Sequence, residues 1–301
     1  MPSALAALDH APVWLNTEPL TADGLRGRVV LVDIWTYSCV NWLRTLPYVR
    51  AWAERYEGRG LVVAGVHAPE FGFEHDLDNV QRATRELGVG YPVVIDNEFA
   101  IWRSLDNHYW PAVYLVDRDG DIRFRHFGEG AYEQTERAIQ GLLGVDEPTV
   151  LVDAGGLAEA ADWDRLGSPE TYLGQARGER RTNDADGLAL NAWALGGDWS
   201  VDEEAAVLDA AGGSIAYRFQ ARDLNLVLAP PASGAAVGFT VTLDGGSPGD
   251  DHGVDVDPSG VGAVAEPRMY QLVRRQATDG DRTFEIAFHD PGVRAYVFTF
   301  G

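Results

Sequence analysis

The sequence predicts an α/β domain in its first half and an all-β domain in its second half. In the first half, near-continuous apolar runs alternate with segments of helical periodicity. Such runs are typical of strands that are buried on both faces of a parallel sheet. In the second half, apolar residues recur at every second position between turns, as in strands with one buried face. The sequence shows no internal repeat.

Four apolar runs are predicted as strands of the α/β domain. They are Val29–Trp35, Leu61–Val66, Val93–Asp96 and Ala112–Val116. A helix is predicted after the first run, because apolar residues from Trp42 to Tyr56 recur at spacings of 4, 3, 4 and 3. A second helix is predicted over 77–87, where Gly88 supplies the stop.

The end of the α/β domain is predicted from a turn and a last helix. Asp119 and Gly120 predict a hairpin turn into an antiparallel edge strand that begins near Ile122. A closing helix is expected over Tyr132–Leu143. This places the α/β domain at residues 1–145. Residues 146–167, rich in Asp, Glu, Gly and Ala, are expected to form a linker or irregular crossing.

The all-β domain is placed at residues 168–301. Its strands are predicted around the alternating sets Ile215–Phe219, Leu224–Leu228, Val237–Leu243, Phe284–Phe288 and Arg294–Phe300. Turns at Asp244-Gly245-Gly246 and Asp290-Pro291-Gly292 separate these strands. Strands of this length with regular turns predict a β-sandwich.

Composition excludes several classes of function. The 301 residues carry a formal net charge of −22, which repels phosphate backbones and argues against a nucleic-acid partner. Every basic residue other than histidine is arginine, so Schiff-base chemistry and stabilisation of a thiolate by lysine are both excluded. No apolar run approaches the ~20 residues of a membrane-spanning helix.

The only cysteine, Cys39, follows the first predicted strand and precedes the first predicted helix. Reactive groups of open parallel sheets lie at this position, outside the carboxyl ends of the strands. A thiol at a helix N-terminus meets unpaired backbone N–H groups and the positive end of the helix dipole, which lower its pKa. We therefore expect Cys39 to be reactive; the alternative is a buried, inert cysteine.

Three further residues stand at informative distances from Cys39. Asp33 lies within the apolar strand, Pro47 lies inside the following helix, and Pro111 opens a buried strand where a cis peptide bond is expected. The segment VLVDIWTYSCVNWLRTLP resembles the active-site segment of thioredoxins. The segment YWPAVYLVDRDGDI is similar to the cis-proline loop and hairpin of the TlpA and ResA branch.

The resemblance extends over nearly the whole chain from Ala11. WTYSCVNWLRTLPYVRAW, VHAPEFGFEHDLDNV, SPETYLG, LALNAWALGGDW, IAYRFQARDLNLVL and DPGVRAYVFTFG together resemble the soluble portion of DipZ-type proteins. The resemblance implies a thioredoxin-like domain joined to a jelly-roll domain similar to carbohydrate-binding modules. It also implies an extracytoplasmic location, whereas the absence of an export signal in the first residues points to the cytoplasm.

The chain departs from the family pattern Cys-x-x-Cys, because it reads Cys39-Val40-Asn41-Trp42. The second cysteine of a dithiol protein resolves the mixed disulfide that the first one forms, and Trp42 has no group for that step. The leading interpretation is an atypical monothiol redox protein that acts on a disulfide-bearing protein or a small thiol. The alternatives are a redox-inactive binding protein that recognises a glycan or a protein through its β-sandwich, and a one-cysteine peroxidase.

The candidate site residues follow from this interpretation. Cys39 is the expected nucleophile, Thr36 is expected to poise the thiol, and Asp33 is the acid that the resemblance associates with the missing cysteine. The residues expected to line the substrate groove are Trp42, Trp110 and Pro111. His67 and Glu70, just after the Leu61–Val66 run, are expected either to support Cys39 or to form a solvated loop pair.

We expect neither a metal nor a cofactor, because the seven histidines show no metal-ligand spacing. The acidic loop from Asp250 to Asp257 leaves a calcium site open as an alternative. Trp193 and Trp199 are expected to belong to the core or, on the jelly-roll resemblance, to a sugar-stacking face.

Overall fold

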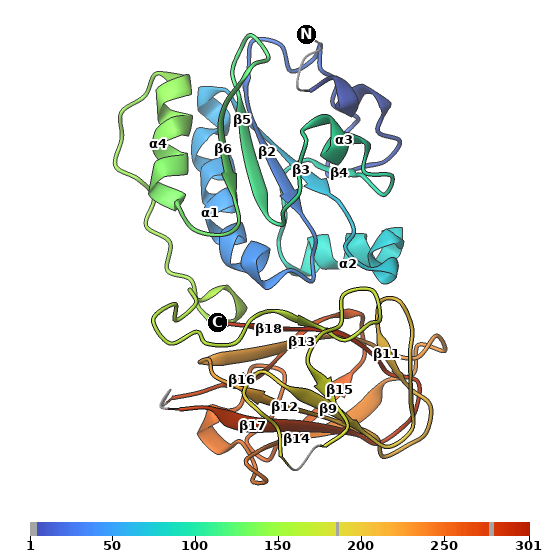
Figure 1. The fold of residues 1–301 in the computed structure, drawn as a ribbon. Helices are drawn as coiled ribbons and strands as arrows, with labels where there is room; N and C mark the ends of the chain where they lie inside the picture. The colour runs from blue at the N-terminus through green and yellow to red at the C-terminus, as the bar shows by residue number, and fades with distance from the viewer. Residues whose placement is uncertain (1–4, 185–186, 277–279) are drawn as a thin grey trace. The chain divides into compact units, whose positions relative to one another are not determined.

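The computed structural model of the chain describes residues 5–184, 187–276 and 280–301. The chain divides into two compact units, Met1–Ala158 and Glu159–Gly301 (Figure 1). This division lies inside the segment 146–167 that was predicted to connect the α/β domain to the all-β domain. The segment contains one short 3-10 helix, η4 (Gly156–Ala158), and no strand.

The first unit is built around one mixed sheet with the strand order β1-β4-β3-β2-β5-β6 (Figure 1). Strands β2, β3 and β4 are parallel, whereas β5 is antiparallel to β2, β6 to β5 and β1 to β4. The main elements are β1 (Trp14–Leu15), β2 (Val29–Trp35), α1 (Val40–Tyr56), β3 (Leu61–His67), α2 (Leu77–Glu86), β4 (Val93–Ile95), α3 (Ala100–Ser104), β5 (Ala112–Val116), β6 (Ile122–Phe127) and α4 (Tyr132–Leu143).

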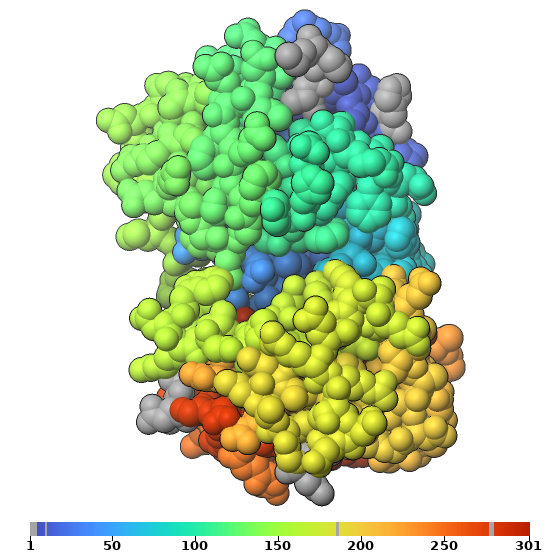
Figure 2. Space-filling view, in the orientation of Figure 1, coloured from blue at the N-terminus to red at the C-terminus, as the bar shows by residue number. Residues whose placement is uncertain are grey.

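Strand β2 is buried along its whole length, and its two faces pack against different elements. Val30, Val32 and Ile34 join a cluster with residues of the N-terminal segment and of α3. The opposite face carries Asp33, which contacts α1 through Trp42. In the space-filling view, later segments coloured teal and green form much of the surface of this unit and cover its central strands (Figure 2).

The predicted strands and helices of this unit are present, with small differences at their ends. Asp96 was predicted as the end of a strand, but β4 stops at Ile95. The carboxylate of Asp96 accepts hydrogen bonds from the backbone N–H groups of Ile101 and Trp102 at 3.1 and 2.8 Å. A side chain that satisfies the N–H groups at the start of a helix stabilises that helix, so Asp96 belongs to the start of α3 rather than to the sheet.

The second unit is largely sheet. One sheet has the order β10-β11-β18-β13-β16, with β7 paired to β18, and the other has the order β15-β14-β17-β12-β9-β8. The strands are β7 (Thr171–Tyr172), β8 (Arg181–Thr182), β9 (Trp193–Gly196), β10 (Trp199–Val201), β11 (Ala206–Leu208), β12 (Ser214–Phe219), β13 (Asp223–Ala229), β14 (Val237–Leu243), β15 (Val261–Val264), β16 (Arg268–Arg274), β17 (Arg282–Phe288) and β18 (Arg294–Phe300).

The alternating apolar residues of the second unit form one core between its sheets. Ile215 and Phe219 of β12 join Leu226 of β13 and Phe298 of β18 in a single cluster. Trp193 is fully buried in this cluster, so it is a core residue and not part of a sugar-stacking face. Trp199 packs against the same core, with its ring edge on Phe288 at 6.0 Å between centroids.

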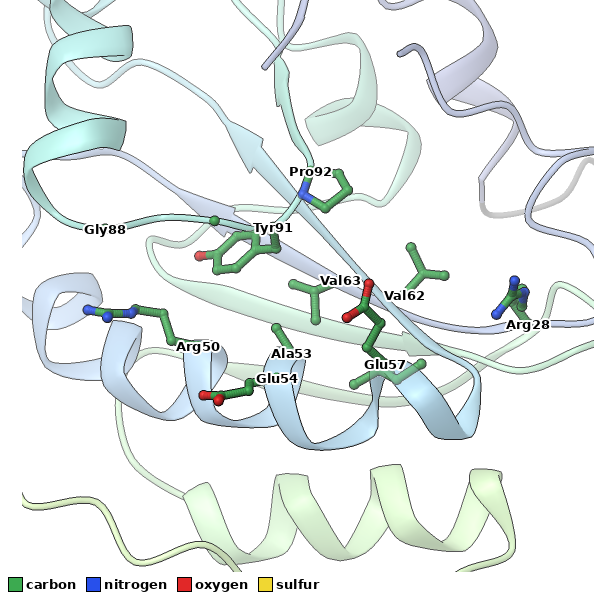
Figure 3. A pocket seen from close by; sticks show the side chains of 12 residues that line it. Arg28, Arg50, Ala53, Glu54, Glu57, Val62, Val63, Gly88, Tyr91 and Pro92 are labelled. Carbon is green, nitrogen blue, oxygen red and sulfur yellow. The ribbon is translucent and has the colours of Figure 1, made fainter. Parts of the chain in front are cut away.

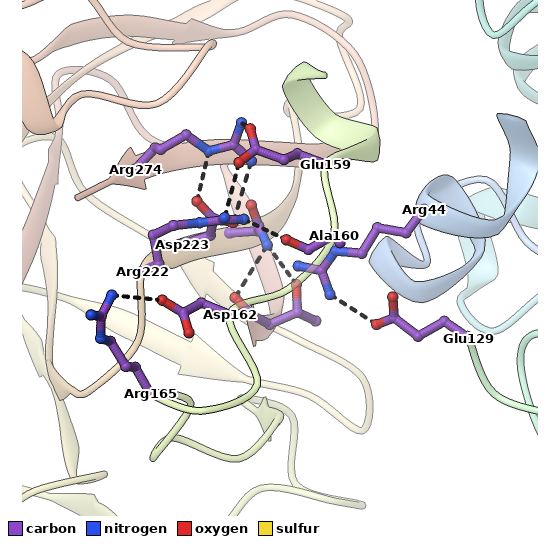
Figure 4. Close-up of polar contacts among 11 residues, drawn as sticks. Arg44, Glu129, Glu159, Ala160, Asp162, Arg165, Arg222, Asp223 and Arg274 are labelled. Carbon is purple, nitrogen blue, oxygen red and sulfur yellow. Dashed lines mark hydrogen bonds and ion pairs between the residues drawn. The ribbon is translucent and has the colours of Figure 1, made fainter. Parts of the chain in front are cut away.

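A buried ion-pair network fixes the start of the second unit to its strands. Asp223, fully buried at the first position of β13, accepts hydrogen bonds from Arg222 at 2.7 Å and from Arg274 at 2.8 Å. Glu159 binds the same two guanidinium groups at 2.9 and 2.8 Å (Figure 4). Two cations and two anions thus neutralise one another, which is the condition for burying charge at low cost.

Candidate redox site

Cys39 occupies the position that the sequence predicts, between the end of β2 and the first turn of α1. It is the N-cap residue of α1, and its carbonyl accepts a hydrogen bond from the N–H of Leu43 at 3.0 Å. Its side chain is half-buried, so solvent reaches it in part. The first turn of α1 contains no acidic residue, so no carboxylate in that turn opposes the helix dipole.

Trp42 occupies the place of the missing second cysteine and is fully buried. Its indole N–H donates a hydrogen bond to Oδ2 of Asp33 at 3.1 Å. Its ring stacks on Trp35, with 4.2 Å between centroids and 19° between planes. A fully buried side chain cannot line a groove, so the prediction that Trp42 contacts substrate is wrong. Its ring packs against Trp35, and its N–H group binds Asp33.

Asp33 is fully buried beneath this helix and has no cationic partner in the described part of the chain. Tyr91 donates a second hydrogen bond to the same oxygen, Oδ2, at 3.1 Å. Burial raises the pKa of Asp33 to about 6, although the hydrogen bonds from Trp42 and Tyr91 lower it. Oδ1 of Asp33 is also buried and has no hydrogen-bond partner among the described residues.

Gly65 makes room for this arrangement. It pairs with Asp33 in the parallel ladder between β2 and β3. A Cβ atom at this position would lie 2.9 Å from both the Trp35 indole nitrogen and the Tyr91 ring. The missing side chain therefore lets Tyr91 reach Asp33 and lets Trp35 pack behind Trp42.

His67 is the last residue of β3 and is fully buried. Its ring meets Trp35 edge-on at 4.9 Å and stacks on Tyr37 at 5.8 Å. Burial lowers the pKa of His67 to about 3, so the ring is neutral at physiological pH. The expected solvated loop pair of His67 and Glu70 is therefore wrong for His67, which is part of the aromatic packing around the site.

The loop that carries Pro111 lies beside the end of β2. The Trp110–Pro111 peptide bond is cis, as expected, and Pro111 is buried. The next residue, Ala112, pairs with Ile34, one position before the end of β2. Trp110 is half-buried, and its indole N–H donates to the carbonyl of Ala68 at 2.9 Å. The role of Trp110 and Pro111 in lining a substrate groove stays a prediction.

An exposed aromatic pair adjoins this loop. Tyr109 is 53% exposed and Phe127 is 39% exposed, and their rings lie 5.0 Å apart. Phe127 pairs with Ala112 at the end of β6, so both side chains belong to the same edge of the sheet as Pro111.

Sequence reasoning missed Glu74, an acid that binds Ser38, the residue before Cys39. It lies in the 3-10 helix η3 (Gly72–His75), is fully buried, and accepts a hydrogen bond from the Ser38 hydroxyl at 2.6 Å. Thr36 is fully buried in the same loop as Cys39. The aromatic residues Phe71 and Phe73, which precede Glu74 at alternate positions, were a signal that this segment packs inward.

A cavity of about 650 Å³ lies between α1, β3 and the loop before β4 (Figure 3). Arg50 and Glu54 line it from α1, and Tyr91 and Pro92 face them from the loop. Cys39 is not among its lining residues. The cavity is linked to the site only through Tyr91, whose hydroxyl group reaches Asp33.

The described residues contain no cluster of three or more His, Cys, Asp or Glu side chains that could hold a metal ion. In the acidic loop considered for calcium, Asp255 pairs with Arg268 at 2.6 Å, and Asp257 accepts hydrogen bonds from Ser259. Among the described helices, none combines the length and the apolar character that a membrane span requires.

The fold of the first unit and the placement of Cys39 define a thioredoxin-like domain, and comparisons with known proteins agree. The chain is a homologue of Protein DipZ from Mycobacterium bovis and Mycobacterium tuberculosis, to which it is 33% identical over 96% of its own length. The alignment covers 41% of the DipZ chains, so this chain spans about two fifths of their length. A family model described as thioredoxin like C-terminal domain matches residues 168–301.

Further relatives match less than half of this chain. The thiol-disulfide oxidoreductase YkuV from Bacillus subtilis is 25% identical over 44% of this chain and 90% of its own length. Among solved structures, a thiol-disulfide isomerase from Corynebacterium glutamicum is 22% identical, with a TM-score of 0.40, over 45% of this chain and 94% of that chain.

Proposed function

We propose that this protein carries out thiol–disulfide exchange through the single thiol of Cys39. The coarse class, a thioredoxin-family protein of the thiol-disulfide oxidoreductase type, is supported by the DipZ and YkuV relatives. The finer statement, that one cysteine acts alone, is supported by the composition, because Cys39 is the only cysteine of the chain, and by its half-buried position at the N-cap of α1.

The reaction has two steps. The Cys39 thiolate attacks one sulfur of a substrate disulfide, the S–S bond breaks, and the second substrate sulfur leaves as a thiolate. An external thiol of the glutathione type then attacks the mixed disulfide and releases the Cys39 thiolate, so that the external thiol ends in a new disulfide with the substrate. The substrate disulfide is the oxidant and the external thiol is the reductant, and Cys39 returns to its starting state.

The single observation that carries this proposal is the half-buried thiol of Cys39 at the N-cap of α1, where no acidic residue in the first turn opposes the helix dipole. The contact between Trp42 and Asp33 bears on how the cycle ends. In the dithiol pattern the corresponding position carries a second thiol, but here it carries an indole that donates to the buried acid. Asp33 therefore has no thiol proton to accept from that position, and an external thiol has to complete the cycle.

Glutathione disulfide tests the proposal. We expect intact-mass spectrometry of the native protein to show one glutathione adduct on Cys39, removed by added dithiothreitol, and no adduct in Cys39→Ser. A Cys39 that stays unmodified in the native protein and reacts only after unfolding would show the thiol to be inert.

The same contact also favours a second candidate, a redox-inactive binding protein. Trp42 fills the position three residues after Cys39 with a packed, hydrogen-bonded side chain, as expected if the redox cycle has been lost. On this candidate, the second unit would be the recognition module, and its jelly-roll, carbohydrate-binding-module-like arrangement stays a prediction. Binding to a glycan array or to a protein partner that is unchanged in Cys39→Ser, together with an inert thiol, would favour it.

The one-cysteine peroxidase has less support from the site. A peroxidase needs a hydroxyl group beside the thiolate, and Thr36 was the candidate. Its hydroxyl is buried and has no hydrogen-bond partner among the described residues, so it makes no hydrogen bond to the thiol. A peroxide-consumption assay with an external thiol decides between this candidate and disulfide exchange.

A further inference from the structure

Glu74 is a buried acid that the exchange reaction, as described, does not use. Its oxygen Oε1 accepts hydrogen bonds from the hydroxyl and, more weakly, the N–H of Ser38, at 2.6 and 3.4 Å. Its other oxygen, Oε2, accepts from the backbone N–H groups of Glu70 and Phe71 at 2.6 and 3.0 Å. One carboxyl group thus joins the loop before Cys39 to the segment after β3.

All four of these partners are neutral donors. Among the described residues, no arginine or histidine forms an ion pair with Glu74. Burial therefore raises the pKa of Glu74 to about 7; the hydrogen bond from Ser38 lowers it, and the charge of Glu70 raises it further. The acid can change its charge in the pH range in which a reactive thiol also ionises.

We propose that Glu74 is a positioning residue for Cys39: through Ser38 it holds the Thr36–Cys39 loop, and its charge controls how readily the neighbouring thiol ionises. The inference rests on the reactivity proposed for Cys39. A negative charge on Glu74 disfavours a second negative charge on the residue next to its hydrogen-bond partner. The two groups therefore titrate as a coupled pair, and the thiolate forms over a wider pH range than a lone thiol would need.

Other groups near this loop that titrate or carry charge could also affect the ionisation of Cys39. They are Asp33 from β2, Tyr37 from the loop itself, His67 from β3, Glu70 from the following segment and His75 from η3. His67 stays neutral from pH 5 to 9, because burial lowers its pKa to about 3. Asp33 titrates about one unit below Glu74, so its contribution can be removed separately with Asp33→Asn.

The test is the rate of Cys39 alkylation by iodoacetamide in the full chain between pH 5 and 9. We expect the wild-type rate to rise more gradually than a single ionisation allows. In Glu74→Gln, the rate should follow a single ionisation curve with its midpoint lower by about one pH unit. Circular dichroism at each pH verifies that the variant remains folded.

Two further variants give shifts of opposite sign. Ser38→Ala removes a hydrogen bond to the ionised carboxylate and so raises the pKa of Glu74; the acid stays neutral to higher pH, and the midpoint of Cys39 alkylation should move to lower pH. Glu70→Gln removes a repelling charge and so lowers the pKa of Glu74; the acid is ionised at lower pH, and the midpoint of alkylation should move to higher pH. A residue with only a structural role would not give shifts of opposite sign.

The outcomes separate the inference from the proposed function. Profiles of wild type and Glu74→Gln that superimpose, with Cys39 alkylated in both, would overturn the role of Glu74 and leave thiol exchange standing. If Cys39 resists alkylation in every native variant, thiol exchange itself fails and the inference fails with it.

Discussion

Asp223 in the second unit and Asp33 and Glu74 in the first are all completely buried, but their partners differ in kind. In the second unit, Asp223 meets the guanidinium groups of Arg222 and Arg274. In the first unit, Asp33 meets only an indole and a phenol, and Glu74 meets only hydroxyl and amide groups. None of these buried acids could be left without partners, because an unpaired charge in the interior is very costly.

This difference in partners separates Asp223, which has a structural role, from Asp33 and Glu74, which can change their charge. A carboxylate between two arginines gains from being ionised, whereas neutral donors only partly offset the cost of burial. The pKa of Asp33 is raised by burial to about 6 and that of Glu74 to about 7, and both lie on segments that contact the neighbours of Cys39. Perturbed acids gather at functional sites because the chemistry there requires them.

The largest effect is expected from the acid with charged partners. Asp223→Ala leaves Arg222 and Arg274 with one carboxylate, Glu159, which is itself 42% exposed. Breaking a buried pair by removing one partner costs about 3–5 kcal/mol. Urea unfolding should show this loss in the free energy of unfolding of the second unit.

An exposed ion pair in the same unit gives the matched control. Arg165 pairs with Asp162 at 3.2 Å, and its side chain is 59% exposed. Arg165→Gln should therefore change the free energy of unfolding by less than about 1 kcal/mol. Equal losses in the two variants would contradict the structural role given to burial of Asp223.

The next largest effect is expected from replacing Trp42, the residue that binds Asp33. Trp42→Cys gives Asp33 a thiol in place of an indole, and it should raise insulin-reductase activity above that of the wild type, because a second thiol can resolve the mixed disulfide within the molecule. The variant should also lose about 3 kcal/mol of stability, because a buried aromatic ring is removed. The double variant Cys39→Ser with Trp42→Cys is the control and should be inactive.

The outcome of that experiment bears on the geometry of the site. Circular dichroism would show whether Trp42→Cys folds. If the folded variant fails to form a disulfide with Cys39 under oxidation, residue 42 does not correspond to the second cysteine of the Cys-x-x-Cys pattern.

Much of this architecture could be predicted from the sequence. The runs Val29–Trp35 and Ala112–Val116 match β2 and β5, because strands buried on both faces read as near-continuous apolar runs that begin and end on apolar residues. The helix Tyr132–Leu143 matches α4, where Gly144 adopts a positive φ of 75° and ends it. Short strands such as β7 and β8 were not predicted, because two residues are too few to show an alternation of apolar and polar side chains.

The site was predicted less completely, because contacts between residues far apart in the sequence produce no local sequence pattern. Cys39, Asp33 and the cis bond before Pro111 follow from local patterns. Tyr91 reaches Asp33 from 58 residues away, and Glu74 reaches Ser38 from 36 residues away. Trp42 was predicted to contact substrate because it takes the place of the second cysteine in the Cys-x-x-Cys pattern. Its position on α1 instead points its side chain toward Asp33 in the sheet.

A smaller effect is expected from the charge of Asp33 itself. Its pKa is about 6 in the folded protein against about 3.9 in the unfolded chain, so its contribution to stability is full below pH 4 and is lost as pH rises through 6. This amounts to about 3 kcal/mol between these limits. Asp33→Asn should therefore show a fall in unfolding free energy between pH 4 and 7 that is smaller by this amount; parallel curves for variant and wild type would contradict it.

The smallest effect is expected from the second donor to Asp33. Tyr91→Phe keeps the ring that lines the cavity but removes the hydroxyl that binds Oδ2. Because that hydrogen bond lowers the pKa of Asp33, its loss should move the pH-dependent fall in stability upward by about half a pH unit, with a loss of about 1 kcal/mol. Tyr109→Phe, an exposed tyrosine on the same unit, should change neither quantity. A Tyr91→Phe curve that superimposes on the wild-type curve would mean that the indole of Trp42 alone compensates the buried acid, and that the cavity wall has no influence on the site beneath Cys39.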